Sequence, residues 1–135
     1  MDTHRAEQQP PGISRVDLQQ HDISAPGREV IQKVVTISTG APAIRHKHPG
    51  GEEFIYVLEG SLEYTVDGLE PTTVNAGGVF FVPADTVHAV RNIGTGDALE
   101  LATYVVEKGK PLLVAAEAAP ERTWGDVLVE SYLEE

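Results

Sequence analysis

From Glu29 onward the sequence is a series of short apolar runs, rich in β-branched and aromatic residues, that turn residues interrupt at close intervals. Every gap between the runs contains glycine, proline, asparagine or aspartate, the residue types that most readily reverse a chain. The Asp67-Gly68 pair is typical of a hairpin turn. This pattern predicts an all-β sandwich or barrel. The runs are EVIQKVVTIS, EFIYVLE, SLEYTV, TTVNA, VFFV, VHAVRN and ALELATYVV.

The length of 135 residues corresponds to one ordinary domain. Residues 1–12 are polar and contain two prolines, so we expect a flexible N-terminal tail there. Residues 13–114 would form the β-domain, and residues 115–135 a C-terminal extension. Within the extension four apolar side chains at helical spacing predict a short helix, which is marginal unless it docks. These side chains are Trp124, Val127, Leu128 and Tyr132.

The composition excludes several classes of function. The formal charge of −11 at pH 7 argues against the basic surface that nucleic acid or an anionic membrane would require. There is no cysteine, which excludes disulfides, thiol catalysis and iron–sulfur clusters and limits metal ligands to nitrogen and oxygen. No apolar stretch has the length of a membrane span or the character of a secretory signal, so we expect a soluble, cytoplasmic protein.

Two histidines one residue apart, His46 and His48, begin a candidate metal site. Because a strand alternates its side chains between two faces, both imidazoles project from the same face and can reach one ion. In the following run, Glu53 shares its face with Ile55 and Val57, whereas Glu52 lies on the opposite face and can stay in water. A carboxylate buried beside apolar residues is costly unless a cation and neighbouring imidazoles offset its charge. The pattern therefore favours a metal ion held between the two segments.

A third histidine, His88, lies among valines in a later run. A lone histidine there is usually a core residue with a satisfied hydrogen bond, and the pair His46 and His48 could also belong to an ordinary exposed strand. However, three of the five histidines occupy strand positions that can converge, which favours shared ligation. The other two, His4 and His21, have no partner at ligand spacing, and we assign them no role.

The spacing of these residues resembles the two signature motifs of the cupin family. The second motif departs at one position, because Asp85 stands where the family usually has glycine. Aspartate tolerates left-handed backbone conformations, so we expect the turn to survive. The first motif, G-x5-H-x-H-x4-E-x6-G, is matched by Gly40, His46, His48, Glu53 and Gly60. The other, G-x5-P-x-G-x2-H-x3-N, is matched by Gly77, Pro83, His88 and Asn92.

The resemblance implies a small single-domain cupin, folded as a double-stranded β-helix or jelly-roll barrel and similar to the quercetinase-like metal-binding cupins. It also implies that His46, His48, Glu53 and His88 hold one divalent transition metal per chain. Around a six-coordinate ion, such a ligand set leaves positions open for water or substrate, as in catalytic sites. Iron or manganese is favoured by the mixed nitrogen and oxygen ligation, and nickel, zinc, copper and cobalt are also accepted.

Three classes of function remain open, each with a small organic molecule as partner. The first is a dioxygenase-like enzyme for a small enol, phenol or dicarbonyl compound, in which Glu53 accepts a proton. The second is an isomerase or lyase acting on a sugar acid or another carbonyl compound. This class needs a proton shuttle, and Tyr64 is the candidate because it lies on the apolar face of its strand, although that position also suits an ordinary core tyrosine. Gln32, Arg91 and Tyr104 are further candidates for the cavity wall, but the pattern does not fix which face each occupies. The third is a non-catalytic module that binds a small ligand. We favour the first class.

The same alternation places Phe54, Tyr56 and Leu58 on the face opposite Glu53. An apolar row on the outside of a barrel is an unusual monomer surface and commonly marks an interface. We therefore expect a homodimer, joined through this sheet or through an added N-terminal strand. The alternative is that the C-terminal segment around Trp124 folds back over the row within one chain.

Overall fold

The structure, a computed structural model, describes residues 11–116. Most of the tail expected over residues 1–12, and the helix expected around Trp124, lie outside this range. Within it the chain forms ten β-strands, and the all-β prediction is confirmed. The strands are β1 (Ile13–Asp22), β2 (Arg28–Ile37), β3 (His46–Lys47), β4 (Glu52–Glu59), β5 (Ser61–Val66), β6 (Thr72–Asn75), β7 (Val79–Val82), β8 (His88–Asn92), β9 (Ala98–Glu107) and β10 (Val114–Ala115).

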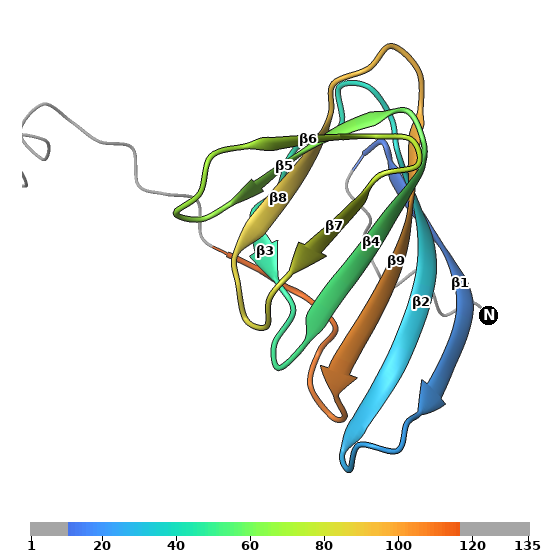
Figure 1. The fold of residues 1–135 in the computed structure, drawn as a ribbon, viewed down its shortest axis with the longest axis vertical. Coiled ribbons are helices and arrows are strands. Elements are labelled where there is room, and N and C mark those ends of the chain that lie inside the picture. The colour runs from blue at the N-terminus through green and yellow to red at the C-terminus, as the bar shows by residue number, and fades with distance from the viewer. Residues whose placement is uncertain (1–10, 117–135) are drawn as a thin grey trace, which may run out of the picture.

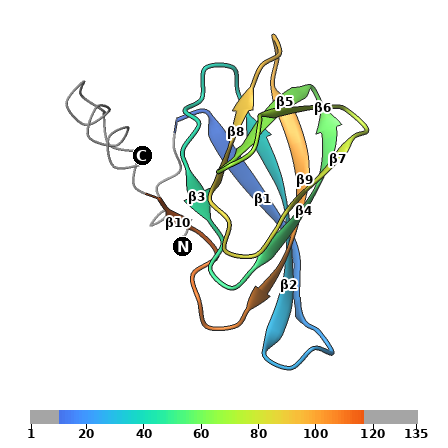
Figure 2. The same cartoon turned by 60° about the vertical axis from the view of Figure 1, so that its left-hand side comes forward.

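The strands build two antiparallel sheets of five strands each (Figures 1 and 2). One sheet has the order β1-β2-β9-β4-β7 and the other the order β10-β3-β8-β5-β6. Strands far apart in the sequence therefore lie side by side: β9 separates β2 from β4, and β8 separates β3 from β5. This is the topology of a double-stranded β-helix, the jelly-roll barrel that the resemblance implied. It brings the segments that carry the histidines and Glu53 to the inside of one barrel.

Each run of the sequence pattern contains or overlaps one strand, from β2 and β4 to β9. Strand β1 was not among the predicted runs. Its sequence, ISRVDLQQHD, is mostly polar, and most of its side chains are exposed. It is an edge strand whose conformation is set by pairing with β2 along almost its whole length. Local propensity is a weak guide to such a strand because its stability comes from the tertiary pairing.

The core follows the alternation along the strands. In β4, Glu53, Ile55 and Val57 are buried, whereas the residues between them are exposed. In β5, Leu62 and Tyr64 are buried on the inward face, as the sequence predicted. Apolar side chains from both sheets meet between them, so the core and the interior of the barrel are one region.

Two turn positions confirm the physical reading of the motifs. Gly60, between β4 and β5, has a φ of +84°, and a Cβ atom there would lie 2.9 Å from the Cβ of Ala98. Only glycine fits both constraints. Asp85 has a φ of 56°, the left-handed conformation expected of a residue in the place of glycine. Its Oδ1 also accepts a 2.9 Å hydrogen bond from the backbone N–H of Gly50, which ties the β7–β8 turn to the turn before β4.

The outer face of the first sheet is apolar where the sequence predicted it to be. Phe54, Tyr56 and Leu58 are 43–45% exposed, and Phe81 on β7 adds a ring 5.0 Å from that of Phe54. Val79, also on β7, is 71% exposed. We call these five residues the apolar row. Separately, the part of the chain that the structure describes contains no helix with the length and apolar character needed to cross a membrane.

Candidate metal centre

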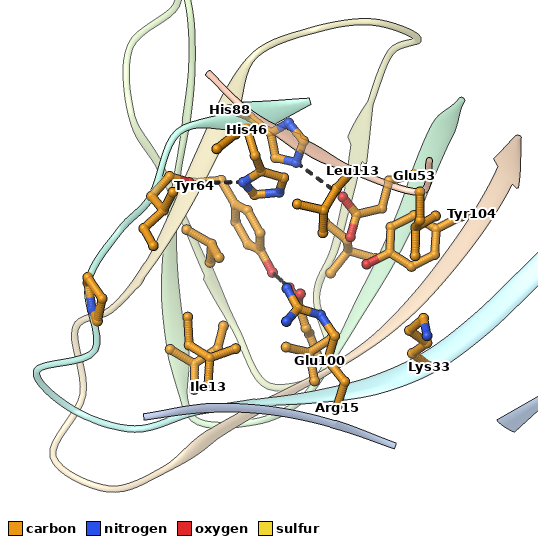
Figure 3. A pocket seen from close by; sticks show the side chains of 18 residues that line it. Ile13, Arg15, Lys33, His46, Glu53, Tyr64, His88, Glu100, Tyr104 and Leu113 are labelled. Carbon is orange, nitrogen blue, oxygen red and sulfur yellow. Dashed lines mark hydrogen bonds and ion pairs between the residues drawn. The ribbon is translucent and has the colours of Figure 1, made fainter. Parts of the chain in front are cut away.

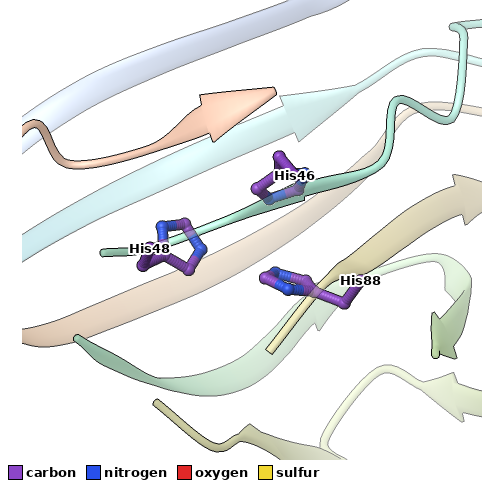
Figure 4. A group of neighbouring side chains, drawn as sticks. All are labelled: His46, His48 and His88. Atoms are coloured by element: carbon purple, nitrogen blue, oxygen red, sulfur yellow. The ribbon is translucent and has the colours of Figure 1, made fainter. Parts of the chain in front are cut away.

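Three histidines from two neighbouring strands meet inside the barrel (Figure 4). His46 begins β3 and is paired in register with His88, which begins β8. His48 follows β3 directly, so the alternation along the chain puts it on the same side as His46. One nitrogen of each ring lies within 4.8 Å of the corresponding nitrogen of the other two. The structure thus brings together the three imidazoles that the sequence analysis named.

Hydrogen bonds to backbone carbonyls orient all three rings. The Nδ1 atom of His46 lies 2.9 Å from the carbonyl oxygen of Ile44, and that of His88 lies 2.9 Å from the carbonyl oxygen of Thr86. In His48 the corresponding distance, to the carbonyl oxygen of Leu112, is also 2.9 Å. A carbonyl oxygen can only accept, so each Nδ1 must carry the proton. In a neutral ring Nε2 then holds a lone pair, the state of a metal ligand.

Glu53 completes the cluster from the opposite sheet. Its Oε1 lies 3.0 Å from Nε2 of His48 and 3.2 Å from Nε2 of His88. The side chain is 3% exposed, as expected from its position among apolar residues on the inner face of β4. Because β4 belongs to one sheet and the histidine strands to the other, the cluster spans the interior of the barrel.

The electrostatics of the cluster favour ligation. Burial, together with the neighbouring His88, lowers the pKa of His46 to about 4, so this ring is neutral at pH 7. Burial alone would raise the pKa of Glu53, but when a proton occupies Nε2 of His48 and of His88, the hydrogen bonds that these rings donate outweigh burial and lower the pKa to about 2. In the metal-bound state the cation takes the place of these protons and stabilises the carboxylate in the same way. Glu53 is therefore a carboxylate at neutral pH. A neutral imidazole and an ionised carboxylate are the forms that bind a cation.

The donor set fits a divalent transition ion. Nε2 of His48 and of His88 both face Oε1 of Glu53, and with Nδ1 protonated a neutral ring offers only a lone pair there. Groups that can only accept hydrogen bonds repel one another at such distances unless a proton or a cation lies between them. Imidazole nitrogen with carboxylate oxygen is a common ligand set for first-row transition ions. These four residues could therefore hold a metal ion.

The cluster opens onto a cavity of about 520 Å³ inside the barrel (Figure 3). His46, Glu53 and His88 form part of its wall, and aliphatic side chains form much of the rest. Tyr64, the predicted proton shuttle, also lines the cavity. Its hydroxyl donates a 2.5 Å hydrogen bond to Oε1 of Glu100, and its ring stacks on Phe80. Tyr64 is thus both a buried core residue and part of the cavity wall.

Of the three residues whose faces the sequence left open, the cavity wall includes Tyr104 but neither Gln32 nor Arg91. Sequence reasoning missed three other polar residues of the cavity: Arg15, Lys33 and Glu100. Glu100 is 4% exposed, and burial, together with the charge of Glu53, raises its pKa to about 8. The ring of Tyr104 lies 4.8 Å from that of His48. The alternation in ALELATYVV could have indicated Glu100, because it shares a face with Ala98 and Ala102 in an otherwise apolar strand. Arg15 gave no such signal, since it lies in the polar strand β1.

Other residues considered from the sequence lie away from the cluster. His21, on β1, has its Nε2 3.2 Å from the side-chain oxygen of Gln19, and the structure does not bring it to the histidines. Arg91 is exposed and donates to Glu63 on the outside of the barrel. Glu52 precedes Glu53 and therefore points to the opposite face of β4.

The chain is similar in sequence to a known protein family and to individual curated proteins. A family model described as Cupin domain matches residues 33–111. Germin-like protein 1-1 of Oryza sativa subsp. japonica is 37% identical over 93 residues, which cover 64% of this chain and 43% of that protein. The chain spans less than half the length of the curated relatives it matches.

Solved structures show the same fold. A double-stranded β-helix protein from Klebsiella pneumoniae is 19% identical with a TM-score of 0.63, covering 83% of this chain and 90% of that chain. An oxalate oxidase in complex with the substrate analogue glycolate is 23% identical with a TM-score of 0.62, covering 78% of this chain and 56% of that chain. At such identities the likeness shows the fold alone.

Proposed function

The chain belongs to the cupin family, and from this premise we propose that it is a metal-dependent, dioxygenase-like enzyme acting on a small enol, phenol or dicarbonyl compound. The observation that carries the proposal is the cluster of three histidines and Glu53, of which His46, His88 and Glu53 form part of the wall of a cavity of about 520 Å³. A purely structural ion is normally closed off by protein ligands, whereas an ion beside a cavity leaves room for substrate.

All four residues would bind the ion, and Glu53 would also take part in proton transfer. His46, His48, His88 and Glu53 would bind it, and the backbone carbonyls behind the rings keep each Nε2 directed toward it. A bound iron or manganese ion supplies redox chemistry with dioxygen and Lewis acidity toward a substrate oxygen. Glu53, ionised at neutral pH, lies where it can accept the proton of an enol or phenol hydroxyl. The aliphatic lining excludes water around the reacting groups.

One solved structure of the same fold is, by its name, an oxalate oxidase, so this fold is compatible with the oxidation of a small organic acid.

An isomerase or lyase is the second candidate, and the hydrogen bond between Tyr64 and Glu100 favours it. Both groups hold protons at neutral pH, because burial and neighbouring charges raise the pKa of the Tyr64 hydroxyl above its usual range and that of Glu100 to about 8. Both lie in the cavity wall with the histidines. A proton donor beside a Lewis-acidic ion is what the isomerisation or elimination of a carbonyl compound requires.

Elemental analysis of the protein purified without added metal, followed by a screen for oxygen consumption, tests the proposal. The substrates to screen are small enols, phenols and 1,3-dicarbonyl compounds. We expect about one iron or manganese ion per chain and oxygen uptake that stops when the metal is removed. Turnover of a carbonyl substrate under strict anaerobiosis would instead support the isomerase or lyase. Ligand binding without turnover in either screen would indicate a non-catalytic module.

A further inference from the structure

The cavity has a second polar region, formed by Arg15, Tyr64 and Glu100, away from the histidines. Figure 3 shows the guanidinium group of Arg15 next to the hydrogen-bonded pair of Tyr64 and Glu100, with His46 and His88 at another part of the wall. The three residues come from β1, β5 and β9 and all line the cavity. The remaining wall is largely aliphatic, with Ile13, Val35, Ile37, Ile55, Val90 and Leu112 among its residues. The cavity thus has two polar regions in a mostly apolar lining.

From this arrangement we propose that Arg15, Tyr64 and Glu100 form a subsite for a carboxylate group, so that the cavity takes a small hydrophobic carboxylic acid. The proposal rests on the proposed function, because it assigns the substrate class of the same site. The carboxylate lies on Arg15, the apolar body fills the aliphatic part of the cavity, and the other end of the molecule faces the histidines.

The chemistry of the three side chains suits a carboxylate. A guanidinium group presents a planar fork of N–H donors that matches the two oxygens of a carboxylate. Tyr64 and a neutral Glu100 carry two O–H groups between them, and one hydrogen bond joins the pair. One O–H is therefore left to donate to a ligand oxygen. A protonated carboxyl group beside a tyrosine hydroxyl is an established way to bind an oxyanion.

The neighbouring charges also favour an anionic ligand. Burial and the nearby charge of Glu53 raise the pKa of Glu100 to about 8, despite the opposing influence of the hydrogen bond from Tyr64 and of Arg15. Lys33, the other cationic group in the wall, is held by Asp17 through a 2.6 Å ion pair. Arg15 thus brings a positive charge to the pair of Tyr64 and Glu100. A carboxylate placed there gains a cation and a neutral hydrogen-bond donor.

The test is calorimetric titration of the full chain, as purified, with benzoate and with its neutral counterpart benzamide. We expect benzoate to bind at least tenfold more tightly than benzamide, and Arg15→Gln to remove this preference while Arg15→Lys keeps part of it. Arg91→Gln is the matched control, because Arg91 is exposed and bonded to Glu63 outside the cavity. Equal affinity for the two probes, or a preference that survives Arg15→Gln, would overturn the subsite.

Substitutions of Tyr64 and Glu100 test whether these two residues donate a hydrogen bond to the carboxylate. They also keep the proposal testable if Arg15→Gln fails to fold. Tyr64→Phe keeps the ring that stacks on Phe80, and we expect it to weaken benzoate binding about fivefold. Glu100→Ala should weaken it similarly, with most of the loss restored in Glu100→Gln, which keeps a neutral hydrogen-bonding group. If Glu100→Ala instead tightens benzoate binding, Glu100 is an ionised counter-ion of Arg15 and the proposal is wrong.

A metal-site variant separates this proposal from the proposed function. His46→Ala should lose the ion, measured by elemental analysis, yet still prefer benzoate to benzamide. Loss of the preference in that variant would show that the carboxylate binds at the ion, which overturns the subsite and leaves the metal enzyme intact. A wild-type chain that contains no metal but shows an Arg15-dependent preference would have the opposite meaning, because the subsite would stand and the proposed function would fail.

Discussion

A histidine that binds a metal commonly donates its second ring N–H to a fixed acceptor, and here a backbone carbonyl accepts from each ring. The lone pairs at Nε2 of His48 and His88 then converge on the carboxylate of Glu53. Each ligand side chain is buried or half-buried, so the surrounding protein allows few other rotamers. Loss of one ligand should therefore weaken the site strongly, since it removes one of four donor groups.

The first prediction concerns these ligands. Glu53→Ala and His88→Ala should retain less than a tenth of the wild-type metal content after dialysis, because each removes a ligand atom from the cluster. Glu52→Ala and His21→Ala are the matched controls, since they remove the same residue types outside the cluster, and they should retain full metal content. Equal metal content in all four variants, measured by elemental analysis, would contradict the ligand assignment.

The second prediction concerns the buried carboxyl group of Glu100. Its pKa in the folded protein, about 8, lies above the ordinary value of 4.5 because of burial and the charge of Glu53. Between these values the folded state holds a proton that the unfolded state has released, so the free energy of unfolding decreases as the pH rises. Relative to Glu100→Gln, the wild type should lose on the order of a few kcal/mol between pH 5 and pH 8. Urea denaturation at several pH values measures this, and parallel curves would refute it.

For individual residues, the sequence predicted the inward or outward direction of a side chain where the alternation along a strand and the motif spacing agreed. The inward faces of Glu53 and Tyr64 followed from the apolar residues two positions away. The orientation of the rings could not be predicted, because one of the carbonyls that sets it belongs to Leu112, far along the chain from His48. Arg15 was missed for a similar reason: only the pairing of β1 with β2 brings it to the cavity.

At the scale of elements, the turn between β8 and β9 depends on one side chain. Asn92 is 8% exposed, and its amide donates to the carbonyl oxygens of Ile37 and Gly96 at 2.8 Å. Its Oδ1 accepts a 2.8 Å hydrogen bond from the N–H of Gly94. These bonds join the end of β8 to the end of β2 in the other sheet. The last position of the second motif is therefore a structural link between the sheets.

The third prediction follows from this link. Asn92→Ala should lower the free energy of unfolding by about 2–3 kcal/mol, because it removes three hydrogen bonds and leaves the Ile37 carbonyl oxygen without this donor. Asn75→Ala is the matched control, since Asn75 is exposed and its side chain accepts one hydrogen bond, from Ser61. That change should cost less than about 1 kcal/mol. Urea denaturation of both variants gives the comparison, and equal losses would argue against the role of Asn92.

The strands themselves were predictable to different degrees. Strands β2, β4 and β9 carry apolar residues on their inner faces, so their sequences report their burial. By contrast, β3 and β10 have two residues each, too few for any period to appear. Strand β1 pairs at the sheet edge with mostly exposed side chains. Its existence depends on a hydrogen-bonding partner, which sequence pattern does not encode.

At the scale of the whole molecule, the apolar row on the outer face of the first sheet predicts a homodimer. Five large apolar side chains, each at least 43% exposed, lie together on β4 and β7. Burying such side chains is worth on the order of 1.5–3 kcal/mol each. We expect sedimentation to show a dimer, and Phe81→Glu to dissociate it by placing a charge in the row. Leu69→Glu is the matched control, because Leu69 is 68% exposed between β5 and β6, outside the row.

Two outcomes would contradict the dimer. One is a wild-type chain that sediments as a monomer at all concentrations. The other is a chain ending before Thr123 that newly self-associates, because it would mean that the C-terminal segment covers the row within one chain. In either case the apolar row would need a different explanation.

The carbonyls behind the histidines would also affect how the protein acquires an ion during synthesis. His46 and His88 take their orientation from carbonyls two residues upstream, so a growing chain can preset these two rings locally. His48 depends on Leu112, which leaves the ribosome much later. A nascent chain that stops short of Leu112 lacks the carbonyl that holds the third imidazole. Tight capture of an ion, and with it the selection between competing metals, would therefore wait until Leu112 has been synthesised and has reached His48.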